Sequence, residues 1–369
     1  GFAAMTSVNE GSHGSAQGDH NIAIGYNALE GGAFAGSPVV FTGNIAIGSL
    51  ALDGTGANSQ TGTIAIGYEA LTALTDGTGN VAIGYQAMAT EDTGDYSTAV
   101  GYQALQNQNY DGDAGNTMLG YRTGNSITDG IRNVFIGRSA GSATTSGNFN
   151  IGIGYGALNA DLTGAAAGTI GIGYGAGNAL TTAPANVAIG HQAMQVHTTG
   201  GGNIAIGYQA MDDTDAGANS KNSQYNVFIG YSAGGGTWTN SECNFNVGVG
   251  AFTLDAALEG ALDNTTVGYA GLTSLKAGGS NTAIGHRAGE RITNGNTNTI
   301  VGAEAGSFIT TANENTIVGN QAGYDLTGAE SVLIGSRAGY NLATVNGNVA
   351  VGRYALYNST AAVDCVVIG

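Results

Sequence analysis

Side chains able to do chemistry are few in this sequence, and their spacing favours contact surfaces over catalysis. The five histidines are spread along the chain. None stands in a His-Glu-x-x-His metal-ligand pair, and the sequence contains no Walker-type phosphate loop. We therefore expect no catalytic residue, no cofactor and no metal site, and the sequence predicts that the protein is not an enzyme.

Aromatic residues provide the candidates for binding. Tyr68, Tyr85, Tyr102 and Tyr121 follow one another at spacings of 17, 17 and 19 residues, and Trp238 is the only tryptophan. Tyrosine and tryptophan are amphipathic and serve well in contact surfaces. We take these five as surface candidates, with a glycan as the ligand class that fits best. The structural alternative is that the tyrosines stack on one another and that the tryptophan packs in the core.

Acidic residues gather in three loops, and we expect them to be solvated loop tips. Calcium binding is the alternative, because carboxylates are its usual ligands. The clusters do not recur from repeat to repeat, which favours the first interpretation. They are Glu91, Asp92 and Asp95, then Asp111 and Asp113, then Asp212, Asp213 and Asp215.

The element that positions all of these residues is a short repeat. The phrase Asn-Val-Ala-Ile-Gly-Tyr-Gln-Ala-Met (80–88) recurs around twenty glycines, from Gly25 to Gly369, and eleven of the nineteen spacings are 17 residues. A fixed short period indicates one supersecondary unit stacked on itself. We therefore expect an all-β parallel β-roll or β-solenoid of about 20 coils with about 17 residues per coil.

Numbered from the central glycine as position 0, the repeat predicts which side chains face which way. Position −3 is β-branched and −1 is aliphatic in all twenty copies, which is the period of a strand, and we expect both to face a core. Position −2 is mostly Ala and never charged, so we expect it to face outward and to be covered by another copy of the chain. The Asn common at −4 should form a hydrogen-bond ladder.

The residues after the glycine predict a tight corner and a second short strand. Position +1 is Tyr in ten of nineteen copies and +3 is Ala in sixteen. We expect the glycine to take a positive φ and the small residue at +3 to pack inward where the coil is thin. From 264 onward position −3 is Thr in four successive copies, which we also expect to face inward. An ice-binding face, which needs exposed Thr ladders, is therefore a remote alternative.

Composition limits the partners. A net charge of −17 with only nine Lys and Arg argues against nucleic acid and against anionic membranes as partners. No apolar run long enough to span a bilayer is present, so this segment should not insert into a membrane. Cys243 and Cys365 lie seven coils apart, too far for a mutual disulfide.

The phrase Asn-x-Ala-Ile-Gly-x-x-Ala resembles the head repeat of trimeric autotransporter adhesins of the YadA type, and its longer form is similar to repeats of phage tail fibres. The resemblance covers about 20–369, with matching stretches at 43–52, 79–88, 202–211 and 347–356. It implies a left-handed coil, three chains around one axis (side by side or intertwined), and attachment outside the cell or on a virion. The period of about 17 is longer than is usual in those adhesins.

Together these features predict a non-enzymatic structural or adhesive fibre segment that binds itself as a homotrimer and attaches to a glycan or protein receptor at a cell surface. Residues 1–20 should form a leading segment or cap. Residues 21–369 should form a single elongated solenoid with longer loops at 30–43 and 212–224. Two alternatives remain open. One is a self-assembling extracellular filament. The other is a left-handed β-helix acyltransferase, for which His191 would be the residue to test.

Overall fold

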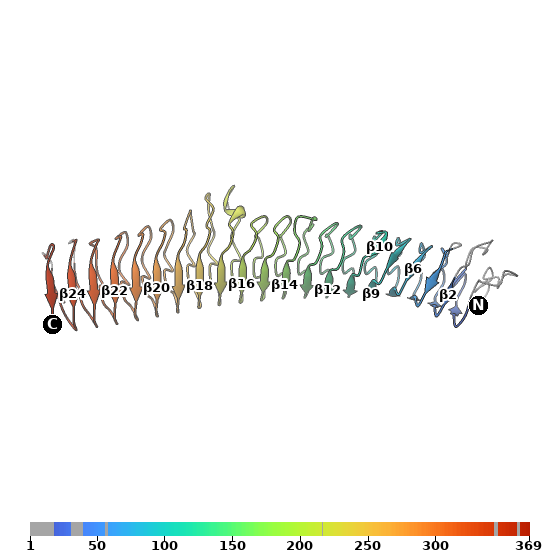
Figure 1. The fold of residues 1–369 in the computed structure, drawn as a ribbon, viewed down its shortest axis with the longest axis horizontal. Helices are drawn as coiled ribbons and strands as arrows, with labels where there is room; N and C mark the ends of the chain where they lie inside the picture. Colours follow the sequence, from blue (N-terminus) through green and yellow to red (C-terminus); the bar gives the residue numbers. More distant parts are fainter. Residues whose placement is uncertain (1–17, 31–39, 56–57, 216, 343–345, 360–361) are drawn as a thin grey trace. The chain divides into compact units, whose positions relative to one another are not determined.

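The computed structural model describes residues 18–30, 40–55, 58–215, 217–342, 346–359 and 362–369 of the 369-residue chain. The chain divides into two compact units, Gly1–Pro184 and Ala185–Gly369. In each unit one short strand per coil pairs in parallel with the strands of neighbouring coils, and the described residues contain no α-helix (Figure 1). The predicted all-β parallel solenoid is thus confirmed, while the prediction of a single elongated domain stays a prediction.

The first unit contains nine three-residue strands on the repeat phrase. Neighbouring strands pair without a register shift, so that Ile64, Ala65 and Ile66 lie opposite Val81, Ala82 and Ile83. The strands are β1 (Ile22–Ile24), β3 (Ile45–Ile47), β5 (Ile64–Ile66), β7 (Val81–Ile83), β9 (Thr98–Val100), β11 (Thr117–Leu119), β12 (Val134–Ile136), β13 (Ile151–Ile153) and β14 (Ile170–Ile172). Five coils add a two-residue strand before position −4: β2 (Phe41–Thr42), β4 (Gln60–Thr61), β6 (Gly77–Thr78), β8 (Gly94–Asp95) and β10 (Gly112–Asp113).

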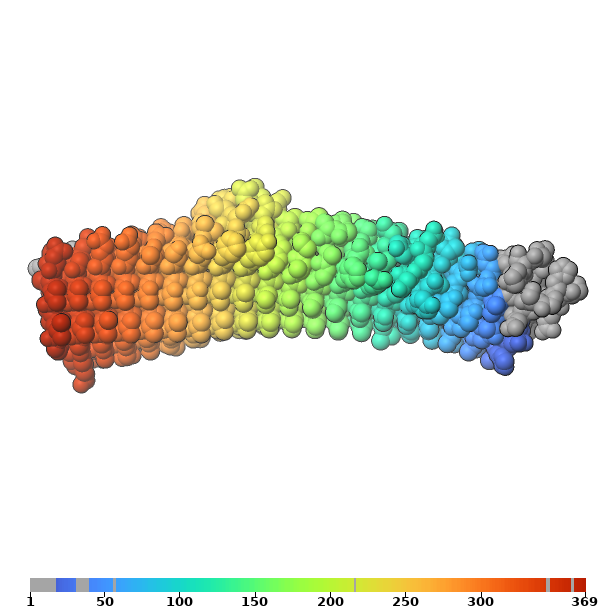
Figure 2. All heavy atoms as spheres, in the orientation of Figure 1, coloured from blue at the N-terminus to red at the C-terminus, as the bar shows by residue number. Residues whose placement is uncertain are grey.

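The second unit contains eleven strands of the same kind and one short 3₁₀ turn, η1 (Ser220–Asn222). η1 lies in the long loop predicted at 212–224 and projects beyond its neighbours (yellow in Figure 1 and Figure 2). The strands are β15 (Val187–Ile189), β16 (Ile204–Ile206), β17 (Val227–Ile229), β18 (Val247–Val249), β19 (Thr265–Val267), β20 (Thr282–Ile284), β21 (Thr299–Val301), β22 (Thr316–Val318), β23 (Val332–Ile334), β24 (Val349–Val351) and β25 (Val366–Ile368). Most of the predicted loop 30–43 and of the predicted cap 1–20 lies outside the described residues.

The central glycine is required both by its backbone angle and by the next coil. Gly84 has a φ of +141°, a conformation that L side chains rarely adopt. A Cβ on Gly84 would also lie 2.2 Å from the carbonyl oxygen of Gly101 in the following coil. Because the same contact recurs along the column, the corner glycines pack backbone against backbone and set how closely the coils stack.

The segment after the corner is a turn and not the second strand that the sequence predicts. Residues at +2 and +4 have a positive φ throughout, for example Gln86 at 52° and Met88 at 50°. This alternation points successive amides at different coils. The Gln86 N–H donates to the Tyr68 carbonyl before it, and the Met88 N–H donates to the Ala104 carbonyl after it. The backbone is therefore hydrogen-bonded in both directions without extended structure.

The orientation predicted for the strand is wrong. Position −2 is the inward one: Ala65, Ala82 and Ala205 are fully buried, whereas Ile83 at −1 is 36% exposed. Thr265 and its successors at −3 likewise lie on the outer side, half-buried or exposed. The physical reason is the thinness of the coil. Its interior has room for one strand side chain packed against the residues at +3 and +4, so the two larger aliphatic residues must lie outside.

The interior is filled by reciprocal volumes at −2 and +4. Where −2 is Phe135, a Cβ on Gly141 at +4 would lie 2.3 Å from the phenyl ring. Phe228 and Gly234 repeat the arrangement, with 2.9 Å from the ring to the added Cβ. Where −2 is Ala, +4 is usually a buried Leu or Met, as with Ala65 and Leu71. Most coils thus accommodate one large side chain, contributed from either −2 or +4.

The predicted Asn ladder is confirmed. Asn133 is buried, its Oδ1 accepts the Asn150 N–H at 3.0 Å, and its Nδ2 donates to the Gly147 carbonyl at 2.7 Å. Its own N–H donates to Oδ1 of Asn116 at 2.9 Å. Each amide therefore satisfies the backbone of the next coil at the sharp bend before the strand. Cys243 and Cys365 are both free thiols, in agreement with the sequence expectation.

Candidate functional site

Both units carry a row of aliphatic side chains on the outer side of their strands. We call positions −3 and −1 of the repeat the aliphatic face. In the first unit it includes Ile24 (57% exposed) and Leu119 (47%), and in the second Val267 (40%) and Ile284 (41%). No residue of this face is charged. Parallel pairing without a register shift aligns these side chains coil by coil, so the face continues from each paired strand to the next within a unit.

Aromatic side chains flank the aliphatic face at −5 and +1. Tyr96, Phe149, Tyr225 and Phe245 at −5 are 50–58% exposed, and all four have positive φ angles of 56–60°. Tyr225 and Phe245 stack at 5.5 Å. This left-handed corner at −5 is not apparent from the sequence, because Gly occupies it in only seven of twenty copies.

The four predicted tyrosines form a stacked column. Ring centroids are 5.3 Å apart between Tyr68 and Tyr85, 5.1 Å between Tyr85 and Tyr102, and 5.3 Å between Tyr102 and Tyr121, with planes within 17° of parallel. Each ring is 41–43% exposed. Because the ring faces inside the column cover one another, the column presents ring edges and hydroxyl groups to solvent. Contact of these tyrosines with a glycan stays a prediction.

The column is interrupted at Arg138, which occupies the tyrosine position of its coil. Its guanidinium carbon lies 5.6 Å from the ring centroids of both Tyr121 and Tyr155. Arg122 lies over the same Tyr121 ring at 5.7 Å. Tyr121 and Arg138 line an open hollow of about 490 Å³. Sequence reasoning did not single out this arginine, because its meaning depends on the rings above and below it.

Position +2 carries a polar ladder beside the tyrosines. The Gln86 amide donates to the Glu69 carboxylate at 2.7 Å, Gln103 donates to Gln86 at 3.0 Å, and Nε of Arg122 donates to Gln103 at 2.9 Å. The amides thus connect a carboxylate at one end of the ladder to a guanidinium at the other.

Trp238 is not a surface residue, which corrects its place among the candidates. It is fully buried, its Nε1 donates to the Gly234 carbonyl at 3.1 Å, and it packs edge-on against Phe228 at 5.9 Å. The loop after Gly234 brings it inward, where it covers the large Phe228 ring. A lone tryptophan in a loop gives no sequence signal that separates this arrangement from an exposed one.

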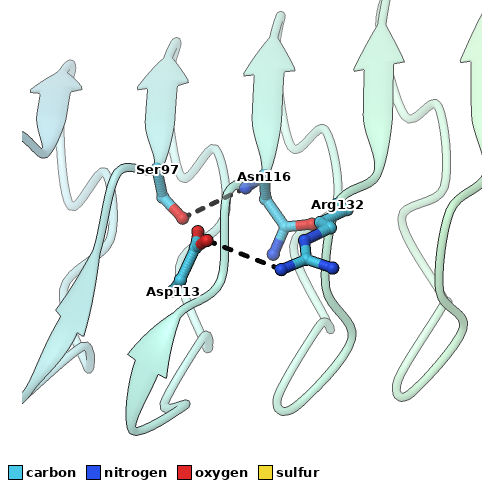
Figure 3. A network of polar contacts seen from close by, with 4 residues as sticks. All are labelled: Ser97, Asp113, Asn116 and Arg132. Carbon is cyan, nitrogen blue, oxygen red and sulfur yellow. Dashed lines mark hydrogen bonds and ion pairs between the residues drawn. The ribbon is translucent and has the colours of Figure 1, made fainter.

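The acidic clusters are spread over several loops and engaged by protein donors. Glu91 is buried and accepts from Gln108 at 2.6 Å, and its burial raises the pKa of this carboxyl. Asp95 accepts the Thr78 N–H at 2.6 Å. Asp113 pairs with Arg132 at 3.5 Å, beside the Ser97–Asn116 contact of the ladder (Figure 3). Within the described ranges, no group of three or more His, Cys, Asp or Glu residues is placed to hold a metal ion.

Three of the histidines, His191, His197 and His286, pack against or hydrogen-bond to neighbouring coils. His191 stacks on Tyr208 at 5.0 Å and His286 on Tyr269 at 5.4 Å, as members of the +1 column. His197 is buried, with Nδ1 2.9 Å from Thr214 Oγ1 and Nε2 3.0 Å from the Gly200 carbonyl. Burial lowers the pKa of His197. The expectation that the protein is not an enzyme stays a prediction.

Comparison with known proteins gives no match to a family model, to a curated protein or to a solved structure. Within the described residues, no helix is long and apolar enough to cross a membrane. Function must therefore be argued from the surfaces of the chain itself.

Proposed function

We propose that this chain is a non-enzymatic structural and adhesive fibre protein whose copies associate through the aliphatic face. In this proposal the coil winds left-handed and three chains form a homotrimer, side by side or intertwined. The assembly is the head or shaft of a bacterial surface adhesin or phage tail fibre. It acts outside the cell or on a virion and binds a glycan or protein receptor. The supporting observation is the uncharged, outward row of aliphatic side chains in every coil.

The size of this face argues for a partner. In the second unit eighteen of the twenty-two residues at −3 and −1 are aliphatic. At roughly 50 Å² of exposed area each, they present about 900 Å² of aliphatic surface, above the roughly 300–600 Å² of the largest patch on a typical monomer. Burying that area at about 25 cal/mol per Å² would return roughly 20 kcal/mol per chain before the costs of association.

A second and third copy of the same chain fit this face better than an unrelated protein. A partner must be flat, uncharged and regular at the spacing of the coils, and another copy meets all three conditions. Closed rotational symmetry then buries the same face on every chain and leaves no aliphatic face exposed for further association. The carboxylates behind the net charge of −17 stand elsewhere in the repeat, so they keep the assembly soluble without opposing contact.

The test is the mass of the protein in solution. Light scattering after size-exclusion chromatography should give three times the chain mass of 36.5 kDa. The double variant Val267→Asp/Ile284→Asp should shift the protein to the mass of one chain while its β-sheet circular dichroism persists, because both side chains face outward. Gln209→Glu, a change at the polar +2 position, is the matched control and should remain trimeric.

Two outcomes separate this proposal from its rivals. A well-folded wild-type monomer at micromolar concentration would contradict the proposed homotrimer. Continuous end-to-end growth with rising concentration would favour the extracellular filament instead.

Ala205→Asp should behave differently from the outward variants. Ala205 is fully buried inside its coil, so a carboxylate there should disrupt the fold itself.

A further inference from the structure

The Lys and Arg residues of the first unit are concentrated in one short stretch of sequence. Residues 1–184 contain thirteen Asp and Glu but only three Lys or Arg side chains, Arg122, Arg132 and Arg138, and these lie within 17 residues of sequence. Two of them, Arg122 and Arg138, lie over the ring of Tyr121. In this predominantly acidic unit, Arg122 and Arg138 thus form a positively charged pair at the end of the Tyr68–Tyr121 column.

The three arginines differ in what already engages them. Arg132 pairs with Asp113 at 3.5 Å, and Arg122 donates to the Gln103 side chain at 2.9 Å. Arg138 is exposed, and within the described part of the chain its guanidinium has neither an ion pair nor a hydrogen-bond acceptor. The two flanking rings nevertheless hold it at 5.6 Å from each centroid. A positioned guanidinium with unused donors is suited to a planar oxyanion.

We propose that Arg138, with Tyr121 and Tyr155, forms a site for the oxyanion of an acidic saccharide, either a uronate carboxylate or a sulfate ester. The hollow of about 490 Å³ beside Tyr121 and Arg138 gives room for one charged sugar unit. The inference deepens the attachment role proposed above and rests on it, but it concerns a column beside the aliphatic face and not the face itself.

The column leading to Arg138 favours a polyhydroxylated chain. Tyr68, Tyr85, Tyr102 and Tyr121 present hydroxyl groups and ring edges at intervals of 5.1–5.3 Å. This interval is similar to the advance per sugar of an extended β-1,4-linked saccharide, so successive sugars meet successive tyrosines. Tyr121 and Tyr155 also differ from rings inside the column, because on the Arg138 side each faces a guanidinium and not another ring. A sugar can therefore contact these two rings next to the charge.

The test compares three hexasaccharides on the full chain by isothermal titration calorimetry. β-1,4-mannuronate carries carboxylates, β-1,4-mannan is its neutral equivalent, and a sulfated mannan supplies the ester. We expect at least one acidic saccharide to bind about tenfold or more tightly than neutral mannan, with an affinity that falls as salt rises. The tighter of the two acidic ligands identifies the oxyanion.

Three variants locate the site. Arg138→Gln should weaken binding of the acidic saccharide about tenfold or more, because a charge-assisted, two-pronged contact is lost. Arg138→Lys should retain part of the affinity, since it keeps the charge but not the fork. Arg132→Gln, which removes an exposed arginine that lies over the Phe149 ring at 5.8 Å, is the matched control and should bind within twofold of wild type.

The inference is overturned if neither acidic saccharide binds at millimolar concentration, if neutral mannan binds equally well, or if Arg138→Gln binds like the wild type. Failure of the fibre proposal is distinguishable. The Val267→Asp/Ile284→Asp variant reports on association alone, and it should retain Arg138-dependent binding of the acidic saccharide, since neither residue lies in the unit that holds the site.

Discussion

The reciprocal packing of positions −2 and +4 makes a sharp prediction at Phe135 and Gly141. Phe135 is fully buried, and its ring fills the space where a side chain on Gly141 would lie. Phe135→Ala should cost about 3–5 kcal/mol, because it leaves a cavity that a narrow coil cannot close. Gly141→Leu alone should also destabilise, by about 2–4 kcal/mol, through overpacking and a left-handed backbone.

The double variant should lose far less unfolding free energy than the two single variants lose together. Phe135→Ala/Gly141→Leu recreates the pairing of Ala65 with Leu71, and the left-handed backbone at +4 holds leucine in other coils, for example Leu158 at a φ of 50°. We expect a coupling free energy of about 2 kcal/mol or more in favour of the double variant.

The assay is urea unfolding followed by circular dichroism, with the four proteins of the cycle compared at equal slope so that the midpoint reports stability. Phe135→Ala combined with Gly323→Leu is the matched control, because Gly323 lies in the other unit, and its effects should add. The reasoning is refuted if the Phe135–Gly141 cycle is additive, or if Phe135→Ala costs under about 1 kcal/mol, as expected of an exposed side chain.

Two further predictions concern a buried amide and a half-buried pair of carboxyl groups. Asn133→Ala should lower the unfolding free energy by about 2–3 kcal/mol, because the Asn150 N–H and the Gly147 carbonyl lose their partner, whereas Asn133→Asp should keep only the first of these contacts; urea midpoints of both variants check this. In the second unit, burial raises the pKa of Asp212 and of Asp255 from 3.8 to about 6, with the Asp212 charge adding to the shift of Asp255. The folded state therefore binds protons at higher pH than the unfolded chain, so stability from this pair should rise as pH falls from 7 through 6 and be complete below about 4. Melting curves at pH 7 and pH 5 should show a smaller gain for Asp212→Asn/Asp255→Asn than for wild type, and an equal gain would contradict the assignment.

The repeat predicted the parallel solenoid, the glycine corner and the Asn ladder, because each depends on one residue type recurring at one position. It did not predict which strand side chains face the coil interior, although the residues at −2 and +4 carry that information. Every repeat with Met, Phe, Ile or Leu at −2 and a residue at +4 has Gly at +4, as with Met118 and Gly124. Such exchange of volume means that the two positions share an interior. The apolar character of −3 and −1 alone does not show this, because it indicates that these side chains avoid water but not whether they face the coil interior or an outer contact surface.

The site at Arg138 was beyond sequence reasoning for a different reason. A single arginine at +1 reads as a substitution in a tyrosine column, and only the stacked coils show that it lies between Tyr121 and Tyr155 with donors unused. Trp238 is the converse case, since a residue conspicuous in the sequence is buried against Phe228.

The inverted facing also changes how folding and assembly are related. Inside a coil the strand contributes only one side chain, often an alanine such as Ala82, while two larger ones such as Val81 and Ile83 stay outside. Much of the hydrophobic free energy encoded in the repeat is therefore realised only when a second surface covers the outer side. In the proposed assembly, each added coil therefore contributes further stability from association. In the proposed fibre, selection for a stable coil and selection for association act on the same −3 and −1 residues, which are β-branched and aliphatic, respectively, in all twenty copies, while the loops between them vary in length.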